Sequence, residues 1–417
     1  MQVVYARCGG IDVHKRRIVA CRIWSDPEPV QVEQMCLGSY TSQLQQLAQW
    51  FREREVLDVA MEATGPYWRP VWNVREAEGL RLTLANPEHI RAVPGHKTDR
   101  HDARWIAELH RHGLVPASFV PSRQPRQLRD LTRLRTKVVQ DHNRVVVRLQ
   151  AVLEDANIKL SSVVSDVMGV SARDMLAGLI AGSSTAAELA QLARGRLQDK
   201  RAALTLALEG HFTPHHGWLV RRLLIQERAL RQQREALEHA IERQLTVADQ
   251  AAMALWDTIP GVNQRVGAVL AAELGVRAEQ FCDAQHAASW VGLCPGNHES
   301  AGKQHSGKTR KGNRWLRCAL VEAAWAAARS KDTYLAALYA RLVVRKGPRR
   351  ALVAVAHSIL VSAYQMLKTG QPYRDLGADY FARLRPERTV RRLVDRLTGL
   401  GYQVQLSRSE GAPVTTE

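Results

Sequence analysis

Four carboxylic acids stand in contexts that set them apart from ordinary surface acids. Asp12 ends an apolar run in GGIDVHK, Glu62 ends another in VAMEATGPYW, and Asp99 and Asp102 lie three apart in KTDRHDARW. An acid within an apolar strand is costly unless it is paired or binds a cation. Carboxylate oxygens are the ligands that Mg²⁺ prefers. We therefore expect three separate segments to bring these acids to one site for Mg²⁺, with Mn²⁺ as an alternative ion.

The alternative for each acid is an ion pair with a base nearby in the sequence. The candidate bases are Lys15, Lys97, Arg100 and Arg104. Three histidines also lie close and would serve as further ligands or proton carriers, although single histidines more often only form hydrogen bonds: His14, His96 and His101.

A second set of residues is basic and suits phosphate. A guanidinium group can donate two parallel hydrogen bonds to phosphate oxygens. Six cationic residues lie close together in one short segment: Lys303, Lys308, Arg310, Lys311, Arg314 and Arg317. Three more candidates for nucleic-acid binding lie on an expected long helix, outside its apolar seam: Arg126, Arg129 and Arg133. The alternatives are a generic basic loop and a solvated helix surface.

Residues 259–275 (IPGVNQRVGAVLAAELG) have the pattern of a helix-hairpin-helix, with Gly261 in the turn. Backbone N–H groups at the start of such a helix can hold a phosphate without reading sequence. An ordinary turn between packed helices is the alternative.

The elements that carry the acids alternate between strands and helices. We expect strands over 3–12, 17–24, 56–63 and near 83, and helices over 42–54, with Ser42 as N-cap, and from about 67. Such alternation is typical of an α/β domain with a mixed sheet.

Long helices follow this domain. Leu131, Val138, Val145 and Val152 recur every seven residues over 125–153, and Leu223, Leu230 and Leu237 do so over 218–245. The repeats predict a helical hairpin or a coiled coil, within one subunit or between two. Small helices are expected over 155–215, and the last ten residues are expected to be disordered.

Composition points to a nucleic-acid partner. The 417 residues carry 59 Lys and Arg against 41 Asp and Glu, giving +18, and nucleic acid is the usual polyanion that offsets such a charge. We find neither an apolar run of about 18 residues nor a signal-peptide pattern. The six cysteines form no CxxC pair, so buried free thiols in the cytoplasm are expected.

The motifs GIDVHK, MEATGPYW and HKTDRHDA, in this order, resemble the DEDD transposases of insertion sequences, the family that also contains the Piv DNA invertase. The resemblance covers about residues 1–155 and resumes over 251–345, where VGLCPGNHESAGKQHSGKTRKGNRWLR resembles the second signature of the family.

The resemblance implies an N-terminal RuvC-like domain of the RNase H fold, with Asp12, Glu62, Asp99 and Asp102 as metal ligands. It also implies a serine nucleophile at Ser300. This chain reads Ser-Ala-Gly where Ser-Gly is usual, so Ser306 is the second candidate. Further implications are DNA donor and target sites, a structured bridge RNA that pairs with both, and homodimers that assemble into tetramers.

We accordingly expect four regions: a RuvC-like domain (1–120), long helices with a helical insertion (121–250), a mostly α transposase domain (251–370) and a basic extension (371–417). The expected protein is a cytoplasmic, nucleoid-associated transposase or recombinase. The competing hypotheses are a junction resolvase or nuclease that uses metal-activated water, and a non-catalytic architectural DNA-binding protein.

Overall fold

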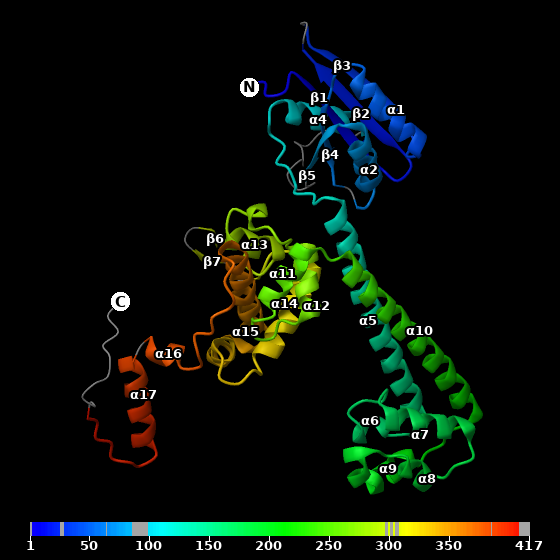
Figure 1. Cartoon of the computed structure of the whole chain (residues 1–417), viewed down its shortest axis with the longest axis vertical. Helices are drawn as coiled ribbons and strands as arrows, with labels where there is room; N and C mark the ends of the chain where they lie inside the picture. Colours follow the sequence, from blue (N-terminus) through cyan, green and yellow to red (C-terminus); the bar gives the residue numbers. More distant parts are fainter. Residues whose placement is uncertain are drawn as a thin grey trace. The chain divides into compact units, whose positions relative to one another are not determined.

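The chain divides into two compact units, Met1–Pro121 and Ser122–Glu417, and each is described by itself (Figure 1). The computed structural model describes residues 2–25, 29–63, 65–85, 99–296, 299–300, 303–304, 308–384 and 386–407. The last ten residues, which were expected to be disordered, lie outside the described residues.

The first unit is built on a mixed five-stranded sheet in the order β3-β2-β1-β4-β5. Strands β1, β2 and β3 pair antiparallel, whereas β4 pairs parallel with both β1 and β5. The bounds are Arg7–Val13 (β1), Ile18–Trp24 (β2), Gln31–Leu37 (β3), Asp58–Glu62 (β4) and Arg81–Ala85 (β5). The mixed α/β sheet expected from the sequence is confirmed.

Helices cover both faces of this sheet. Thr41–Arg52 (α1) and Trp68–Glu78 (α2) belong to one side, where Phe51 and Trp72 pack with Ile11 and Met61. Asp99–Arg111 (α4) covers the other side. A central strand covered on both faces must be apolar on both, which explains why β1 and β2 are buried along nearly their whole length.

Two details of the first unit differ from the sequence prediction. Strand β3 was not predicted, because it is an edge strand in which exposed and partly buried residues alternate. Helix α1 begins at Thr41, so Ser42 lies inside its first turn and is not the N-cap.

The second unit opens with two long helices, Arg123–Asp155 (α5) and Pro214–Gln244 (α10), which pack along each other. Val138, Val145 and Leu149 of α5 and Leu237 of α10 are buried along them. The pair is a helical hairpin, one of the expected arrangements. Small helices lie between them, as expected: Leu160–Val163 (α6), Val170–Ala181 (α7), Ala186–Gln191 (α8), Gly195–Lys200 (η1) and Arg201–Leu208 (α9).

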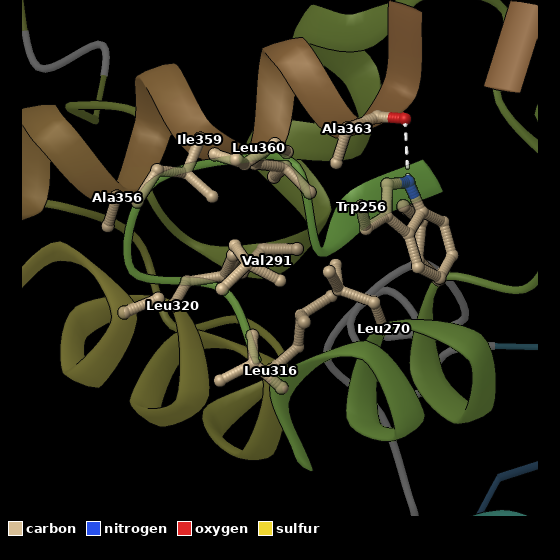
Figure 2. Packing of buried hydrophobic residues seen from close by; sticks show 14 of the residues in the cluster. Trp256, Leu270, Val291, Leu316, Leu320, Ala356, Ile359, Leu360 and Ala363 are labelled. Carbon is tan, nitrogen blue, oxygen red and sulfur yellow. Dashed lines mark hydrogen bonds between the residues drawn. The ribbon is translucent and has the colours of Figure 1, made fainter. Parts of the chain in front are cut away.

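A helical bundle follows, with a core of small and branched residues (Figure 2). Trp256 is fully buried there, and its indole N–H donates to the carbonyl oxygen of Ala363 over 3.0 Å. The bundle consists of Val247–Trp256 (α11), Gln264–Glu273 (α12), Ala278–Gln280 (η2), Ala284–Val291 (α13), Arg314–Ala327 (α14) and Tyr334–Thr369 (α15).

Helix α15 is two helices joined at a kink, where Gly347 has φ 74° and Pro348 follows. By length and composition α15 qualifies as a membrane span, but half of the relevant window is buried inside the protein. Its contacts with α13 and α14 are those of a core helix. The chain continues into Tyr380–Arg383 (α16) and Pro386–Gly399 (α17).

The cysteines only partly follow the prediction. Cys8 and Cys21 are buried free thiols, and burial raises the pKa of each to about 12. Three others are exposed, contrary to the expectation that the free thiols are buried: Cys36, Cys282 and Cys318.

Candidate active site

Asp12 and Glu62 stand beside each other on neighbouring parallel strands. The register of β1 with β4 pairs Ile11 with Met61, and Asp12 and Glu62 are the next residue on each strand. Side chains at equal register positions point to the same face of a sheet. The fold therefore brings together two acids that are 50 residues apart in the sequence.

Helix α4 crosses this same face, and it runs antiparallel to β1. The Sγ atom of Cys8 lies 3.5 Å from the carbonyl oxygen of Ala107. Earlier in the chain, Val4 N–H donates to the carbonyl oxygen of Arg111 over 2.9 Å. Two residues after Cys8, a Cβ on Gly10 would stand 2.3 Å from the carbonyl oxygen of Ala103 and 2.4 Å from the amide nitrogen of Ala107. As β1 proceeds toward Asp12, its contacts thus shift toward the start of α4. The first turn of α4 accordingly lies at the end of the sheet that carries Asp12 and Glu62.

The remaining two acids belong to that first turn. Asp99 is the first residue of α4, and Asp102 is partly buried three residues later, on the same helix face. The side chain of Asp99 lies outside the described residues. Within the described part of the chain, no three His, Cys, Asp or Glu side chains stand close enough to hold a metal ion. The backbone thus gathers the segments, but the ligand set itself stays a prediction.

The donor chemistry of this site fits a hard cation. Asp12 is only 6% exposed, and its Oδ2 lies 3.1 Å from Nε2 of His14. Arg104, one of the bases considered as a partner for the acids, binds Glu108 at 2.8 Å. A buried carboxylate beside a second carboxylate supplies the oxygen ligands that Mg²⁺ takes.

Ser300 lies in a β-hairpin that projects from the bundle of the second unit. Glu299–Ser300 (β6) pairs antiparallel with Lys303–Gln304 (β7), so that Ser300 stands opposite Lys303. On either side of the hairpin in the sequence, Gly296 N–H donates to the carbonyl oxygen of Lys308 over 2.8 Å. The side chains of Ser300 and Lys303, and the whole of Ser306, lie outside the described residues.

The base of this hairpin is closed by tight backbone contacts. Gly292 has φ 81° and ends α13, and a Cβ on it would stand 2.7 Å from the carbonyl oxygen of Arg310. A Cβ on Gly312 would stand 2.4 Å from the amide nitrogen of Gly292. Asn313 N–H donates to the carbonyl oxygen of Trp290 over 3.1 Å. The two ends of the loop are therefore fixed against each other.

A buried acid holds this base to the rest of the bundle. Glu273 has a side chain with 0% exposure, and it accepts hydrogen bonds from Nε and Nη2 of Arg133 at 2.6 and 2.7 Å. It also accepts one from Nδ2 of Asn313 at 2.7 Å. Asn313 in turn caps α14, because its Oδ1 accepts from the backbone N–H groups of Trp315 and Leu316.

Sequence reasoning missed Glu273 and Asn313 as residues that support the loop. The signal for Glu273 is an acid inside the apolar run VGAVLAAELG, the same signal that singled out Glu62. A charged group in such a run needs a partner, but the sequence did not indicate which base supplies it.

The basic residues proposed to bind nucleic acid fall into two groups. Beside the hairpin, Lys308, Arg310, Lys311 and Arg314 are exposed and Arg317 is partly buried, whereas the side chain of Lys303 lies outside the described residues. Arg314 stacks over Trp315 at 4.7 Å from the ring centroid. This group remains accessible to phosphate.

Two arginines of the second group bind other parts of this chain. Arg133 is bound to Glu273, and Arg129 donates to the backbone carbonyls of Ala272 and Glu273 at 2.6 and 2.8 Å. Arg126 is partly buried.

A Cβ on Gly261 would stand 2.2 Å from the carbonyl oxygen of Ala323. Packing against α14 thus accounts for this glycine, and its contact with phosphate stays a proposal.

Comparisons with known proteins bear on both units. Residues 9–158 match the DEDD_Tnp_IS110 family, described as a transposase, and residues 253–340 match the family described as Transposase IS116/IS110/IS902. These two ranges contain the four acids and Ser300.

Two relatives carry the same description. The "Putative transposase y4pF/y4sB" of Sinorhizobium fredii is 30% identical over 164 residues, which cover 38% of this chain and 40% of that protein. The "Probable family 20 transposase" of Pseudomonas aeruginosa is 26% identical over 288 residues, which cover 68% of this chain and 75% of that protein. The match to the Sinorhizobium fredii protein therefore spans less than half the length of that protein.

The two family matches and the two named relatives support an enzyme that acts on DNA, a transposase. More specifically, both matched families are of the IS110 type, so over these two ranges the chain is similar to IS110-family transposases.

Proposed function

We propose that this transposase cuts and rejoins DNA strands during the movement of an insertion sequence. The observation that carries the proposal is the position of Asp12 beside Glu62, at the end of the sheet where α4 begins. The strand order β3-β2-β1-β4-β5 with one helix across the acidic face supports an RNase H-like, RuvC-like first unit.

In this proposal Asp12, Glu62, Asp99 and Asp102 hold Mg²⁺, and Mn²⁺ can replace it. The bound ion would neutralise charge on the phosphate that reacts. The protein itself contributes the orientation of the acids, because Gly10 lets α4 approach β1 closely. His14, 3.1 Å from Asp12, restrains that carboxylate.

Ser300 is the proposed nucleophile, and Ser306 is the second candidate. The Oγ of the nucleophilic serine forms a bond to phosphorus while the bond from phosphorus to one ribose oxygen breaks. Overall, the proton of the serine hydroxyl is transferred to that leaving oxygen. A hydroxyl of another strand reverses the step, releases the serine and restores a phosphodiester, so no ATP is required. The hairpin base fixed by Glu273 and Asn313 supports the positioning of this serine.

The guide and the assembly also belong to the proposal. We expect a bridge RNA to supply base pairing with donor and target DNA, so that the protein mainly binds backbones. Lys308, Arg310, Lys311 and Arg314 are the exposed cations that suit this role. Homodimers are expected to pair into tetramers in the cytoplasm.

The test mixes the full chain with RNA transcribed from DNA flanking its gene, a labelled donor and target, and Mg²⁺. We expect a covalent protein–DNA adduct on a denaturing gel, absent in Ser300→Ala and in Asp12→Asn. An adduct that persists in Ser300→Ala but not in Ser306→Ala would assign the nucleophile to Ser306. Cut DNA without an adduct would support the water-using nuclease, and binding without cutting would support the architectural protein.

A further inference from the structure

The C-terminal helix α17 (Pro386–Gly399) presents an apolar face that the described part of its own chain leaves exposed. Val390, Leu393, Val394 and Leu397 are three and four residues apart and therefore share one face. All fourteen residues of α17 are described, and none has a buried side chain. Leu393 remains 51% exposed. Exposed apolar faces of this kind mark interaction sites.

The rest of α17 is basic. Its other positions carry Arg388, Arg391, Arg392 and Arg396 against Glu387 and Asp395. The helix therefore suits a surface that combines an apolar groove with carboxylates around it.

The second unit contains such a groove, a cavity of about 320 Å³ that α5, α10, α11, α12 and α14 line together. Its apolar lining comes from Val139, Ile241, Leu245, Met253, Ala268 and Val269. Glu238, Glu242 and Glu322 also line it. Arg135 pairs with Glu238 and Arg265 pairs with Glu322. Both arginines line the groove as well, so its charged lining is three carboxylates against two guanidinium groups.

We propose that the groove of one copy binds α17 of a second copy. Leu393 and Leu397 insert into the apolar part, and the flanking Arg391 and Arg396 face the carboxylates, as an amphipathic helix lies in a groove. The exchange is reciprocal, so each of two copies gives one helix and receives one, which is the isologous contact of a twofold dimer.

A second copy is favoured because the segment before α17 is fastened to its own bundle. Phe381 stacks on Tyr334 at 5.4 Å between ring centroids. Tyr334 N–H donates to Oδ1 of Asp375 over 2.9 Å, and Tyr373 N–H donates to Oγ1 of Thr258 over 3.0 Å. With these contacts in place, the groove is open and the apolar face of α17 is exposed in the same chain. Reciprocal exchange covers both surfaces at once.

A disulfide test distinguishes a second copy from the same chain, because Cys318 is exposed and lines the groove. Leu393→Cys is introduced in a full-length background with Cys36→Ser and Cys282→Ser, without nucleic acid. Copper phenanthroline with dissolved oxygen accepts the two electrons and two protons as the two thiols form one S–S bond. We expect a covalent dimer on a non-reducing gel, lost when Cys318→Ala is added.

The matched control is Arg392→Cys, on the opposite face of α17, which we expect to remain non-covalent. Leu393→Asp should raise the dissociation constant of the dimer at least tenfold in sedimentation equilibrium, with an unchanged melting temperature of the monomer, because α17 buries no side chain in its own chain. An intrachain disulfide between residues 393 and 318, or self-association that Leu393→Asp leaves unchanged, would overturn the proposal. Neither result bears on adduct formation by Ser300.

Discussion

Asn313 donates from Nδ2 to Oε2 of Glu273 over 2.7 Å, and its Oδ1 simultaneously caps the first turn of α14. One side chain therefore joins the end of α12 to the start of α14, at the point where the loop that carries Ser300 ends. Because Glu273 also binds Arg133 of α5, the base of the hairpin is connected to the long helical hairpin.

Asn313→Ala should lower both stability and adduct formation. Loss of the N-cap costs about 1 kcal/mol, and the base of the hairpin loses one of its ties, so we expect slower adduct formation at saturating DNA. The matched control is Asn263→Ala, which removes the N-cap of α12 without a contact to Glu273. Urea unfolding and single-turnover kinetics measure the two effects. Equal losses of activity in both variants would show that the cap alone matters.

Glu273→Gln should destabilise the second unit strongly. The substitution leaves the partly buried Arg133 without its carboxylate, and breaking a buried pair by removing one partner costs about 3 kcal/mol or more. The double variant Glu273→Met with Arg133→Met should recover only part of this loss in urea unfolding. Apolar replacements of buried pairs are often tolerated, but Arg129, 3.5 Å from Glu273, and Asn313 still lose their acceptor. A stable single variant would contradict this account.

Asp12→Asn should abolish Mg²⁺-dependent cutting while the first unit stays folded. A ligand that binds only the folded state raises its melting temperature, so Mg²⁺ should stabilise the wild type and not the variant. Asp58→Asn is the matched control, because Asp58 begins β4 at the opposite end from Glu62 and pairs with Arg81. If both variants respond to Mg²⁺ as the wild type does, the ion binds elsewhere.

Gly10→Ala should destabilise the first unit, because its Cβ would stand 2.3 Å from Ala103 O and 2.4 Å from Ala107 N, both backbone atoms of α4. Overpacking of this kind costs about 1–3 kcal/mol and would displace α4 with its two acids, so cutting should fall as well. Gly217→Ala is the control, since its nearest neighbours lie at ordinary contact distances of 3.6 and 4.0 Å. Thermal unfolding with a cleavage assay compares the two.

Acid should weaken the α5–α10 hairpin through Glu227. Burial acts to raise the pKa of this carboxyl, but hydrogen bonds from Arg173 at 2.8 Å and His142 at 3.1 Å outweigh it, and the pKa lies below its ordinary value. The folded state therefore binds fewer protons than the unfolded state as this group titrates. Its stabilisation is present above the ordinary glutamate pKa and is lost as the pH falls through the lowered one.

The measurement is urea unfolding of the wild type and Glu227→Gln over a pH series. The difference in their free energies of unfolding should be constant near neutral pH and shrink below the ordinary glutamate pKa. A difference that does not change with pH would show that the charge of Glu227 contributes nothing.

The sequence by itself determined the local elements and the unusual acids. Apolar runs and seven-residue repeats predicted strands β1, β2, β4 and β5 and the two long helices, because the period of burial is a local property of a strand or helix. It also singled out Asp12 and Glu62, because an acid at the end of an apolar run has a recognisable context. The edge strand β3 was not predicted from the sequence, because its one partly buried face produces only a weak alternation of apolar and polar residues.

Only the tertiary structure decided which residues meet. Arg133 and Glu273 are 140 residues apart, and the chain holds many arginines and acids that local patterns treat as equivalent. Position 10 likewise requires glycine only because the backbone of α4 lies close to it in the folded unit, and not because a turn forms there. The physical reason is that ion pairs and close backbone contacts depend on how the folded elements pack. That packing depends on residues far apart in the sequence, so no short segment predicts it.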